Sequence, residues 1–266
     1  MQTSQTFDIM IVAAGNGTRM GDYSLPKILT KINGKSNLHN TFDRLKEAKN
    51  IGHIYIIVNK RNHEAINASV NEYVSHYTHP LIDAVSIIEI ESGRGDGHAV
   101  IEASEKIGHL GKIISSMFFV MWGDAYLTSG EIFNDCTDIL ENNKNVSMII
   151  PVINERNPYV TFIVDKNMEC LGADFSKRGE NHPSGFHDQC IFLCNRRTTI
   201  ELLKVMHNAY LKNGRYVTDS GELTFLYLVH FLYNFSDPAK AIITDSPVLS
   251  YNTMGEVKEI EKILLQ

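Results

Sequence analysis

Near the N-terminus, two cationic side chains follow a glycine-rich turn that ends an apolar run. The run extends from Ile9 to Ala14 and is typical of a strand buried on both faces of an α/β sheet. Gly15 and Gly17 allow successive backbone N–H groups to point into one concavity, which attracts anions without any side chain. Arg19 and Lys27 add a guanidinium and an ammonium. Together these features predict a binding site for a triphosphate.

The spacing of the glycines excludes the two best-known phosphate motifs. A dinucleotide fingerprint that starts at Gly15 requires its third glycine at Met20, and Gly21 comes one residue late. A Walker motif ending in Gly34-Lys35-Ser36 requires a glycine at the position of Leu29. An ordinary strand and loop with incidental charges is the remaining alternative.

The same loop resembles the signature of the sugar-phosphate nucleotidylyltransferases, and especially of their N-acetylglucosamine-1-phosphate uridylyltransferase branch. It consists of Ala13-Ala14-Gly15-Asn16-Gly17-Thr18-Arg19-Met20, followed by Pro26-Lys27. Further segments are similar to the family in the same order, so the resemblance covers nearly the whole chain. They are Gly95-Asp96-Gly97-His98-Ala99-Val100, Trp122-Gly123-Asp124, the segment from Asn213 to Asp219, and Tyr251-Asn252.

The resemblance implies a nucleotide site built from two loops. Arg19 would contact the leaving phosphates, and Lys27 would bridge the α-phosphate and the phosphate of the incoming acceptor. Asp188 would lie in the acceptor site, whereas His98 could either touch the nucleotide or pack against a neighbouring element. The implied nucleotide contacts are Ala13, Ala14, Gly15, Asn16, Gly17, Thr18, Gly95, Asp96, His98 and Gly123.

Asp124 and Asn252 are the implied ligands of Mg²⁺, which favours carboxylate, phosphate and water oxygens. A lone aspartate after a strand is also a common turn residue, and Asn252-Thr253 before an expected helix equally suits an N-cap. The second pKa of an acceptor phosphate is about 6, so the phosphate is largely ionised at neutral pH and needs no general base. The site would have to supply positive charge, orientation and in-line geometry.

Composition agrees with a soluble enzyme. The 266 residues are 43% hydrophobic, which is enough for a large core, and the net charge of −6 disfavours a nucleic-acid partner. Residues 1–7 are polar, and no apolar run reaches the length of a membrane span, so we expect no membrane partner and a cytoplasmic location. The oligomeric state stays open. The four cysteines are expected as reduced thiols rather than a disulfide framework, because no secretion signal is seen. Cys190 and Cys194 with His182 and His187 fit no standard zinc spacing, and in a strand Cys190, Phe192 and Cys194 would line one face.

Strand and helix patterns alternate through the first part of the chain, as in a parallel α/β sheet. The carboxyl ends of such strands meet at one crevice, and both glycine-rich loops and Asp124 fall at such ends. We expect strands at 7–14, 53–59, 85–90, 117–122 and 145–152, and helices at 37–49, 61–76, 97–108 and 129–142, the last capped by Thr128 or Ser129.

The second part of the chain has a different texture. Residues 158–194 form short strand-like runs and predict an antiparallel flap, which in the resembled family would cover the acceptor. Helices at 196–212 and 219–235, a strand at 240–244 and a helix from 254 follow, and Asp219 and Glu222 would open the second of these helices. The resemblance implies a Rossmann-like GT-A fold in one domain, 1–266, with a nucleotide-binding half (1–152) and an acceptor-binding half (153–266).

Three departures from the resembled branch bear on the substrates. Ile90, between Glu89 and Glu91, stands where the branch has the glutamine that reads uracil. The branch holds its amino sugar with residues at two further positions. Phe175 occupies the first, or Asp174 if the alignment shifts by one residue, and Asp188 occupies the second. These departures count against uridine and against an N-acetylhexosamine phosphate. The segment from Asp174 to Asp188, rich in Asp, His, Lys and Arg, suggests a small, polar, zwitterionic phosphorylated acceptor. Related cytidylyltransferases act on such molecules, including phosphocholine, which favours CTP over UTP.

Other functions stay open at the level of sequence. One is a UTP-dependent sugar-1-phosphate uridylyltransferase, and another is a non-catalytic nucleotide-binding module. A metal-dependent glycosyltransferase is disfavoured, because Asp124 is followed by Ala125-Tyr126 rather than by the x-Asp of an Asp-x-Asp motif.

Overall fold

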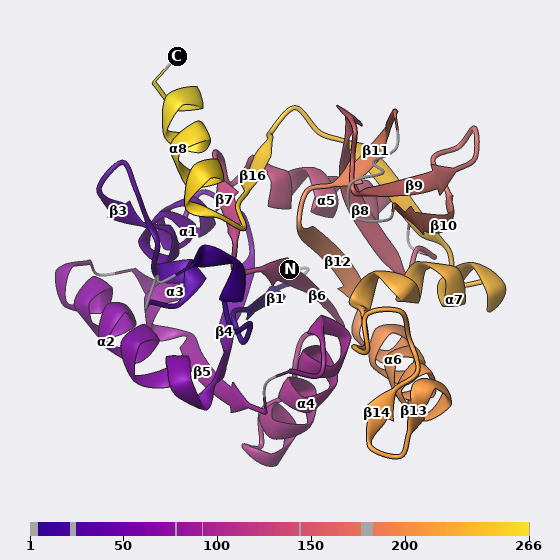
Figure 1. The fold of residues 1–266 in the computed structure, drawn as a ribbon, viewed down its shortest axis with the longest axis horizontal. Helices are drawn as coiled ribbons and strands as arrows, with labels where there is room; N and C mark the ends of the chain where they lie inside the picture. Colours follow the sequence, from indigo (N-terminus) through magenta and orange to yellow (C-terminus); the bar gives the residue numbers. More distant parts are fainter. Residues whose placement is uncertain are drawn as a thin grey trace.

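The computed structural model describes residues 5–21, 25–77, 79–91, 93–143, 145–176 and 183–265. A ten-stranded sheet runs through both halves of the chain, in the order β10-β9-β11-β8-β12-β6-β1-β4-β5, with β15 paired to β8. In Figure 1 the strands of the first half, in indigo and magenta, lie to the left of those of the second half. The carboxyl ends of the parallel strands therefore gather at one side of a continuous sheet.

Four parallel strands make up the first half of the sheet. Every residue of β1 except Val12 is buried, with Met10 in one core and Ile9 and Ile11 in the other, as expected of a strand covered on both faces. The strands are β1 (Phe7–Val12), β4 (Ile51–Asn59), β5 (Val85–Ile90) and β6 (Met117–Trp122), and all of their pairings are parallel.

The second half of the sheet is mixed. The strand β12 (Ile191–Asn195) is antiparallel to both of its neighbours, β6 and β8 (Met148–Arg156), and β15 (Ala239–Ile243) is parallel to β8. Three strands extend the sheet as an antiparallel flap: β9 (Val160–Val164), β10 (Cys170–Phe175) and β11 (Ser184–Asp188). The antiparallel texture predicted for 158–194 is present, but its last strand, β12, belongs to the centre of the sheet.

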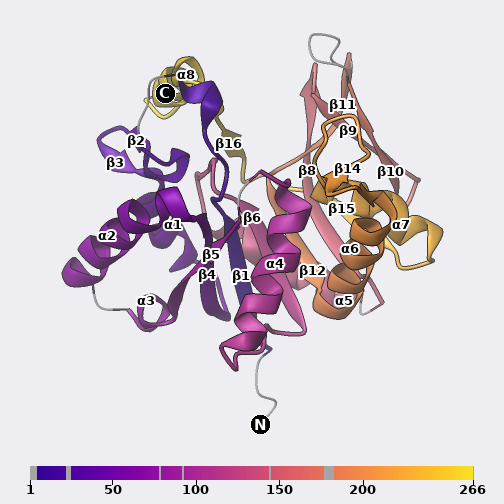
Figure 2. The ribbon, with the colours of Figure 1, turned by 60° about the horizontal axis from the view of Figure 1, so that its bottom comes forward.

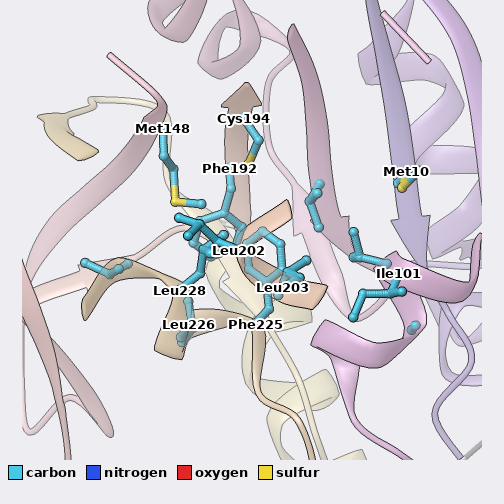
Figure 3. Close-up of a cluster of buried hydrophobic side chains, with 14 of the residues drawn as sticks. Met10, Ile101, Met148, Phe192, Cys194, Leu202, Leu203, Phe225, Leu226 and Leu228 are labelled. Atoms are coloured by element: carbon cyan, nitrogen blue, oxygen red, sulfur yellow. The ribbon is translucent and has the colours of Figure 1, made fainter. Parts of the chain in front are cut away.

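Helices cover both faces of the sheet. The helices α4 (Asp96–His109), α6 (Arg196–Tyr210) and α7 (Leu228–Asn234) pack on one face, and Figure 2 shows α4 and α6 side by side. In Figure 3, Phe192 and Cys194 of β12 meet Leu202 and Leu203 of α6 in this core. The opposite face carries α1 (Asn37–Leu45), α2 (Lys60–His76) and α5 (Glu131–Asn142).

A third, smaller core fixes the C-terminal helix. The helix α8 (Met254–Ile263) packs through Val257 and Ile260 against Ile32 and Met20. Ile32 lies on the small hairpin of β2 (Lys31–Ile32) and β3 (Lys35–Ser36), and Met20 ends the 3-10 turn η1 (Thr18–Met20). Because this core joins the N-terminal loop to the end of the chain, it brings the segment before α8 to the carboxyl ends of β1 and β6. Within the described ranges, no helix combines the length and apolar character that crossing a membrane requires.

The predicted helix at 219–235 is wrong in its first part. Residues 217–224 form turns, the 3-10 turn η3 spans Phe225–Tyr227, and α7 begins only at Leu228. The backbone of Leu223 bonds to Arg94 and Gly97, at distances of 2.9 Å each, and so holds this segment against the start of α4. Asp219 and Glu222 therefore open no helix, because tertiary hydrogen bonds replace the intrahelical ones.

Other boundaries differ by a few residues. The strand expected at 145–152 is β8 at 148–156, and the helix expected at 129–142 begins at Glu131. Gly130 is its N-cap residue, although the Ser129 hydroxyl accepts a hydrogen bond from the Glu131 N–H at 3.1 Å. The sequence did not predict three short antiparallel strand pairs. They are β2 with β3, β13 (Leu211–Lys212) with β14 (Arg215–Tyr216), and β7 (Ala125–Leu127) with β16 (Val248–Ser250).

An ion pair between His187 on β11 and Glu155 on β8 predicts a pH-dependent stability of the flap. The His187 Nδ1–H donates to Glu155 Oε2 at 2.6 Å. Burial disfavours the charged imidazolium, but this bond and the charges of Asp188 and Glu155 outweigh burial and raise the pKa of His187. The hydrogen bond from His187 lowers the pKa of Glu155.

The stabilisation from His187 is present below its unfolded pKa of about 6.5 and is lost as the pH rises through its raised pKa. The contribution of Glu155 is present above its unfolded pKa and is lost as the pH falls through its lowered pKa. We expect His187→Gln to lower the melting temperature most between about pH 5 and pH 6.5 and least at about pH 9. His109→Gln, on the exposed end of α4, is the control. A deficit that does not change with pH would contradict the ion pair.

Candidate active site

The glycine loop after β1 is held from behind by two asparagines, Asn59 at the end of β4 and Asn62 in α2. Asn59 Nδ2 donates to the carbonyl of Ala14 at 2.8 Å, and Asn62 Nδ2 lies 3.4–3.5 Å from the carbonyls of Ala13 and Gly15. The Asn59 Oδ1 also caps α2 by accepting from the Asn62 N–H at 2.9 Å. With these carbonyl groups bound on the α2 side, the loop presents its other side to the carboxyl ends of the strands.

Gly123 lies in close contact with the end of β1. Its N–H donates to the carbonyl of Val12 at 2.9 Å. A Cβ at this position would lie 3.0 Å from both the Val12 carbonyl oxygen and the Ala13 Cβ. A side chain here would crowd the end of β1, and the close approach places Asp124 directly beside the glycine loop.

Lys27, Asp124 and Asn252 meet at one point. The Lys27 Nζ lies 2.7 Å from Asp124 Oδ2 and 2.9 Å from Asn252 Oδ1. The Lys27 and Asp124 side chains are only 17% and 25% exposed. We refer to these three residues, for which a catalytic role is proposed below, as the catalytic cluster. The three residues come from distant parts of the sequence, and all three were predicted as site residues.

The pairing of β7 with β16 brings the cluster together. Ala125, which follows Asp124, pairs with Ser250, and Tyr251 comes next. The Tyr251 N–H donates to the carbonyl of Asp124 at 3.3 Å, and its hydroxyl donates to the carbonyl of Lys27 at 2.6 Å. Tyr251 is fully buried. One residue thus fixes the backbone of two members of the cluster and is adjacent in sequence to the third.

The buried Asn37 supports the turn that carries Asp124. Its Nδ2 donates to the carbonyls of Gly123 and Ala125, at 3.2 and 2.9 Å. Asn37 is the first residue of α1, and the Ser36 hydroxyl caps this helix. The amide therefore locks the carbonyl groups on both sides of Asp124 and leaves its carboxylate turned to Lys27.

Asn252 is not the N-cap of α8. That position belongs to Thr253, whose hydroxyl accepts from the Glu256 N–H at 3.3 Å, while the Glu256 carboxylate accepts from the backbone N–H groups of Thr253 and Asn252. The capping box leaves the Asn252 side chain available to bind Lys27. The N-cap alternative for this side chain is therefore wrong.

Arg19 and Thr18 lie exposed on η1, beside the exposed Asn16. Gly17 precedes them with φ 64°, a left-handed conformation that glycine adopts without strain. No ion pair joins Arg19 to another residue in the part of the chain that the structure describes. Among those residues, no ion pair has to break before the guanidinium binds an anion.

The second loop is organised by Asp96, but not as expected. Its Oδ1 accepts from the N–H groups of Gly97 and Phe225, at 2.8 and 2.7 Å. Burial raises the pKa of Asp96 to about 6, although these backbone hydrogen bonds act in the opposite direction. At Gly95 a Cβ would lie 2.5 Å from the carbonyl oxygen of Leu223. Asp96 and Gly95 thus join the second loop to the segment before η3.

His98 points into the protein rather than toward the catalytic cluster. Its side chain is 8% exposed, and its ring lies 5.7 Å from the ring of His207 and 6.2 Å from that of Tyr216. Burial, with the charge of Arg94, lowers the pKa of His98. The structure therefore favours the packing alternative for this residue.

Asp188 is buried at the end of β11, next to a tight turn. Its Oδ1 accepts from the Cys190 N–H at 2.9 Å, and burial raises its pKa. The carbonyl of Cys190 accepts from the Trp122 N–H at 3.0 Å. The pKa of the Cys190 thiol is raised by burial and by the charges of Asp188 and Asp124, and the charge of Lys27 partly offsets this. The turn therefore borders the catalytic cluster on the side opposite the glycine loop.

Cys190 does not share a face with Phe192 and Cys194, because it lies in a turn with φ 58° and packs in the other core. His182, one of the two histidines considered for zinc, lies outside the described residues. Among the described residues, no three of the His, Cys, Asp and Glu side chains gather at a possible metal site. The cluster itself offers one carboxylate and one amide oxygen, a set that suits Mg²⁺ bound mainly through phosphates and water.

A cleft of about 710 Å³ opens beside the glycine loop, between the start of α2 and the end of β5. It is bordered by Asn16 at one side and by Glu89 and Glu91 at the other. The side chain of Ile90 is buried between them. The remaining lining residues are Asn59, Lys60, Arg61 and Lys106.

A profile of the MobA-like NTP transferase domain matches residues 9–200. The chain belongs to this family. The bifunctional protein GlmU of Buchnera aphidicola subsp. Schizaphis graminum is 26% identical over 272 residues, which cover 96% of this chain and 50% of that protein. GlmU of Clostridium novyi is 28% identical over 162 residues, or 60% of this chain and 32% of that protein. This member of the family thus spans half or less of the length of these curated relatives.

Solved structures show the same fold. HddC from Yersinia pseudotuberculosis, complexed with GMP-PN, superposes with a TM-score of 0.68 at 18% identity and covers 97% of this chain and 100% of that one. A UDP-glucose pyrophosphorylase complexed with UDP-glucose gives a TM-score of 0.75 at 14% identity, covering 98% and 99%. These findings confirm the Rossmann-like α/β fold and the resemblance to sugar-phosphate nucleotidylyltransferases.

The close approach of Gly123 gives a test of the local packing. We expect Gly123→Ala to destabilise the protein by about 1–3 kcal/mol, because the added methyl overlaps the end of β1. Gly15→Ala is the matched control, since a Cβ there meets nothing within 4 Å. Urea unfolding measures both variants. Equal stabilities would show that Asp124 is not held against the glycine loop in this way.

Proposed function

We propose that this protein transfers a nucleoside monophosphate from a nucleoside triphosphate to a small phosphorylated acceptor, with release of pyrophosphate. The observation that carries the proposal is the convergence of Lys27, Asp124 and Asn252 beside an anion-binding glycine loop. The acceptor phosphate is itself the nucleophile, so the protein has to supply fixed positive charge that offsets the repulsion between the two polyanions. The cluster and Arg19 can supply that charge.

Each side of the cluster then has a role. The glycine loop and Arg19 bind the β- and γ-phosphates, and Lys27 holds the α-phosphate together with the acceptor phosphate. Asp124 and Asn252 would hold Mg²⁺, which supplies charge neutralisation at the phosphates when it is bound. The acceptor attacks from the side of Asp188, because the glycine loop occupies the other side. In this arrangement residues 1–152 bind the nucleotide, and residues 153–266 supply most of the acceptor site.

The cleft beside Asn16 supports CTP over UTP. Cytosine presents an amino donor where uracil presents a carbonyl acceptor, and a carboxylate accepts from the former and repels the latter. Glu89 and Glu91 place two carboxylates on this cleft. Uridylyl transfer to a sugar 1-phosphate is the second candidate, because a UDP-glucose pyrophosphorylase bound to UDP-glucose has this fold.

The flap supports a small, zwitterionic acceptor. Phe175 and Tyr227 are half-buried with their rings 5.1 Å apart, and the charges of Asp219 and Asp96 act on the Tyr227 hydroxyl. Aromatic faces and nearby carboxylates suit a cationic group. An acceptor with a phosphate at one end and an amine at the other would match the cluster and this aromatic pair.

Pyrophosphate release tests the proposal. The protein is incubated with Mg²⁺, each of the four nucleoside triphosphates, and a panel containing phosphocholine, phosphoethanolamine and sugar 1-phosphates. We expect release only when a triphosphate and an acceptor are both present, with CTP the best donor. Lys27→Ala should lower kcat by at least about a hundredfold, since electrostatic groups at a transition state contribute on this scale. Lys31→Ala, an exposed lysine nearby, is the control.

Two outcomes would contradict the proposal. Equal activity of Lys27→Ala and the wild-type protein would show that the cluster is not catalytic. Binding of triphosphates without pyrophosphate release from any pair in the panel would favour a non-catalytic module, and turnover of a nucleotide sugar would favour a glycosyltransferase.

A further inference from the structure

The ammonium of Lys27 lies between the two oxygens that would hold a metal ion. It is 2.7 Å from Asp124 Oδ2 and 2.9 Å from Asn252 Oδ1, so both oxygens already bind a cation. Within the described ranges, Lys27 is also the one basic side chain within ion-pair distance of Asp124. Carboxylate and ammonium neutralise each other, which leaves the cluster with no net charge to attract a divalent ion.

The backbone of Lys27 is held in place, whereas its long side chain contains several rotatable bonds. Its carbonyl accepts from the Tyr251 hydroxyl at 2.6 Å and from the Thr30 N–H at 2.9 Å, and the following residue, Ile28, is buried in the core. The stem of the side chain lies along the glycine loop, since a Cβ built on Gly17 would be 3.8 Å from Lys27 Cγ. From this fixed backbone, rotation of the stem carries the ammonium from the oxygens of the cluster toward the loop that faces the phosphates.

We propose that Lys27 is the counter-ion of Asp124 in the nucleotide-free protein. A divalent ion binds to the cluster only when a triphosphate is present, because the Lys27 ammonium then binds the phosphates and leaves the oxygens of Asp124 and Asn252. This inference rests on the proposed function for the location of the phosphates. A divalent ion alone would meet the like charge of Lys27 in a half-buried site, where such repulsion is weakly screened. A triphosphate carries enough negative charge to bind both Lys27 and the ion.

Mn²⁺ binding in the absence of any nucleotide tests this role. Mn²⁺ is titrated into the wild-type protein and Lys27→Met, and the free ion is followed by electron paramagnetic resonance. We expect Lys27→Met to bind Mn²⁺ at least roughly tenfold more tightly, because the competing charge is gone while the stem is retained. Asp124→Asn in the Lys27→Met background should remove the gain, which places the ion at the cluster.

Two controls separate charge from packing. Lys27→Arg keeps the cation and should retain the weak Mn²⁺ binding of the wild-type protein. Lys31→Met removes an exposed lysine outside the cluster and should change nothing. If circular dichroism shows that Lys27→Met is unfolded, Lys27→Gln takes its place with the same expectation.

Equal or weaker Mn²⁺ binding by Lys27→Met, compared with the wild-type protein, would overturn the proposal. A gain that survives Asp124→Asn would also overturn it, because the ion would then bind elsewhere. Neither result depends on turnover. If the wild-type protein releases pyrophosphate but Lys27→Met binds Mn²⁺ no more tightly than the wild-type protein, the proposed function stands and only the counter-ion role is lost.

Discussion

The contact of one ammonium with a carboxylate and an amide oxygen is the interaction on which the functional site depends. Lys27, Asp124 and Asn252 are half-buried, and each would be costly to place there alone. Their mutual hydrogen bonds satisfy them at the carboxyl ends of β1 and β6. A charged group held by protein partners in this way is oriented before any substrate arrives, which is what a reaction between two anions requires.

The fold imposes this contact through short elements rather than through the large sheet alone. The sheet brings Asp124 beside the glycine loop, because β1 and β6 are parallel neighbours and Gly123 permits close approach. The three-residue pairing of β7 with β16 then brings Asn252 to the same place, and the buried Tyr251 ties the backbones of Lys27 and Asp124 together. The two sides of the cluster consequently face different surroundings, with the glycine loop on one side and the Asp188 turn on the other.

A second set of contacts couples the two loops that flank the site. Asp96, expected as a nucleotide contact, binds the backbone at Gly97 and Phe225, and the absence of a side chain at Gly95 allows Leu223 to approach. The start of α4 and the segment before η3 are therefore held together. Asp219 and Tyr227 flank this segment, so the second loop and the aromatic pair near the flap are supported by the same stretch of chain.

The sequence by itself determined the buried strand β1 and the alternation of strands and helices in the first half, because these depend on local periodicity. The resemblance of its motifs to a known family singled out Lys27, Asp124 and Asn252, which the structure places in contact. The sequence did not determine the path of residues 217–224, where hydrogen bonds to Arg94 and Gly97 override a helical pattern. The supporting roles of Asn37, Asn59 and Asn62 were also decided by the tertiary structure, and an asparagine at or near the start of a helix was the only local signal. Such roles depend on which distant carbonyl groups arrive beside a side chain, and that is fixed only when the sheet and its short hairpins are assembled.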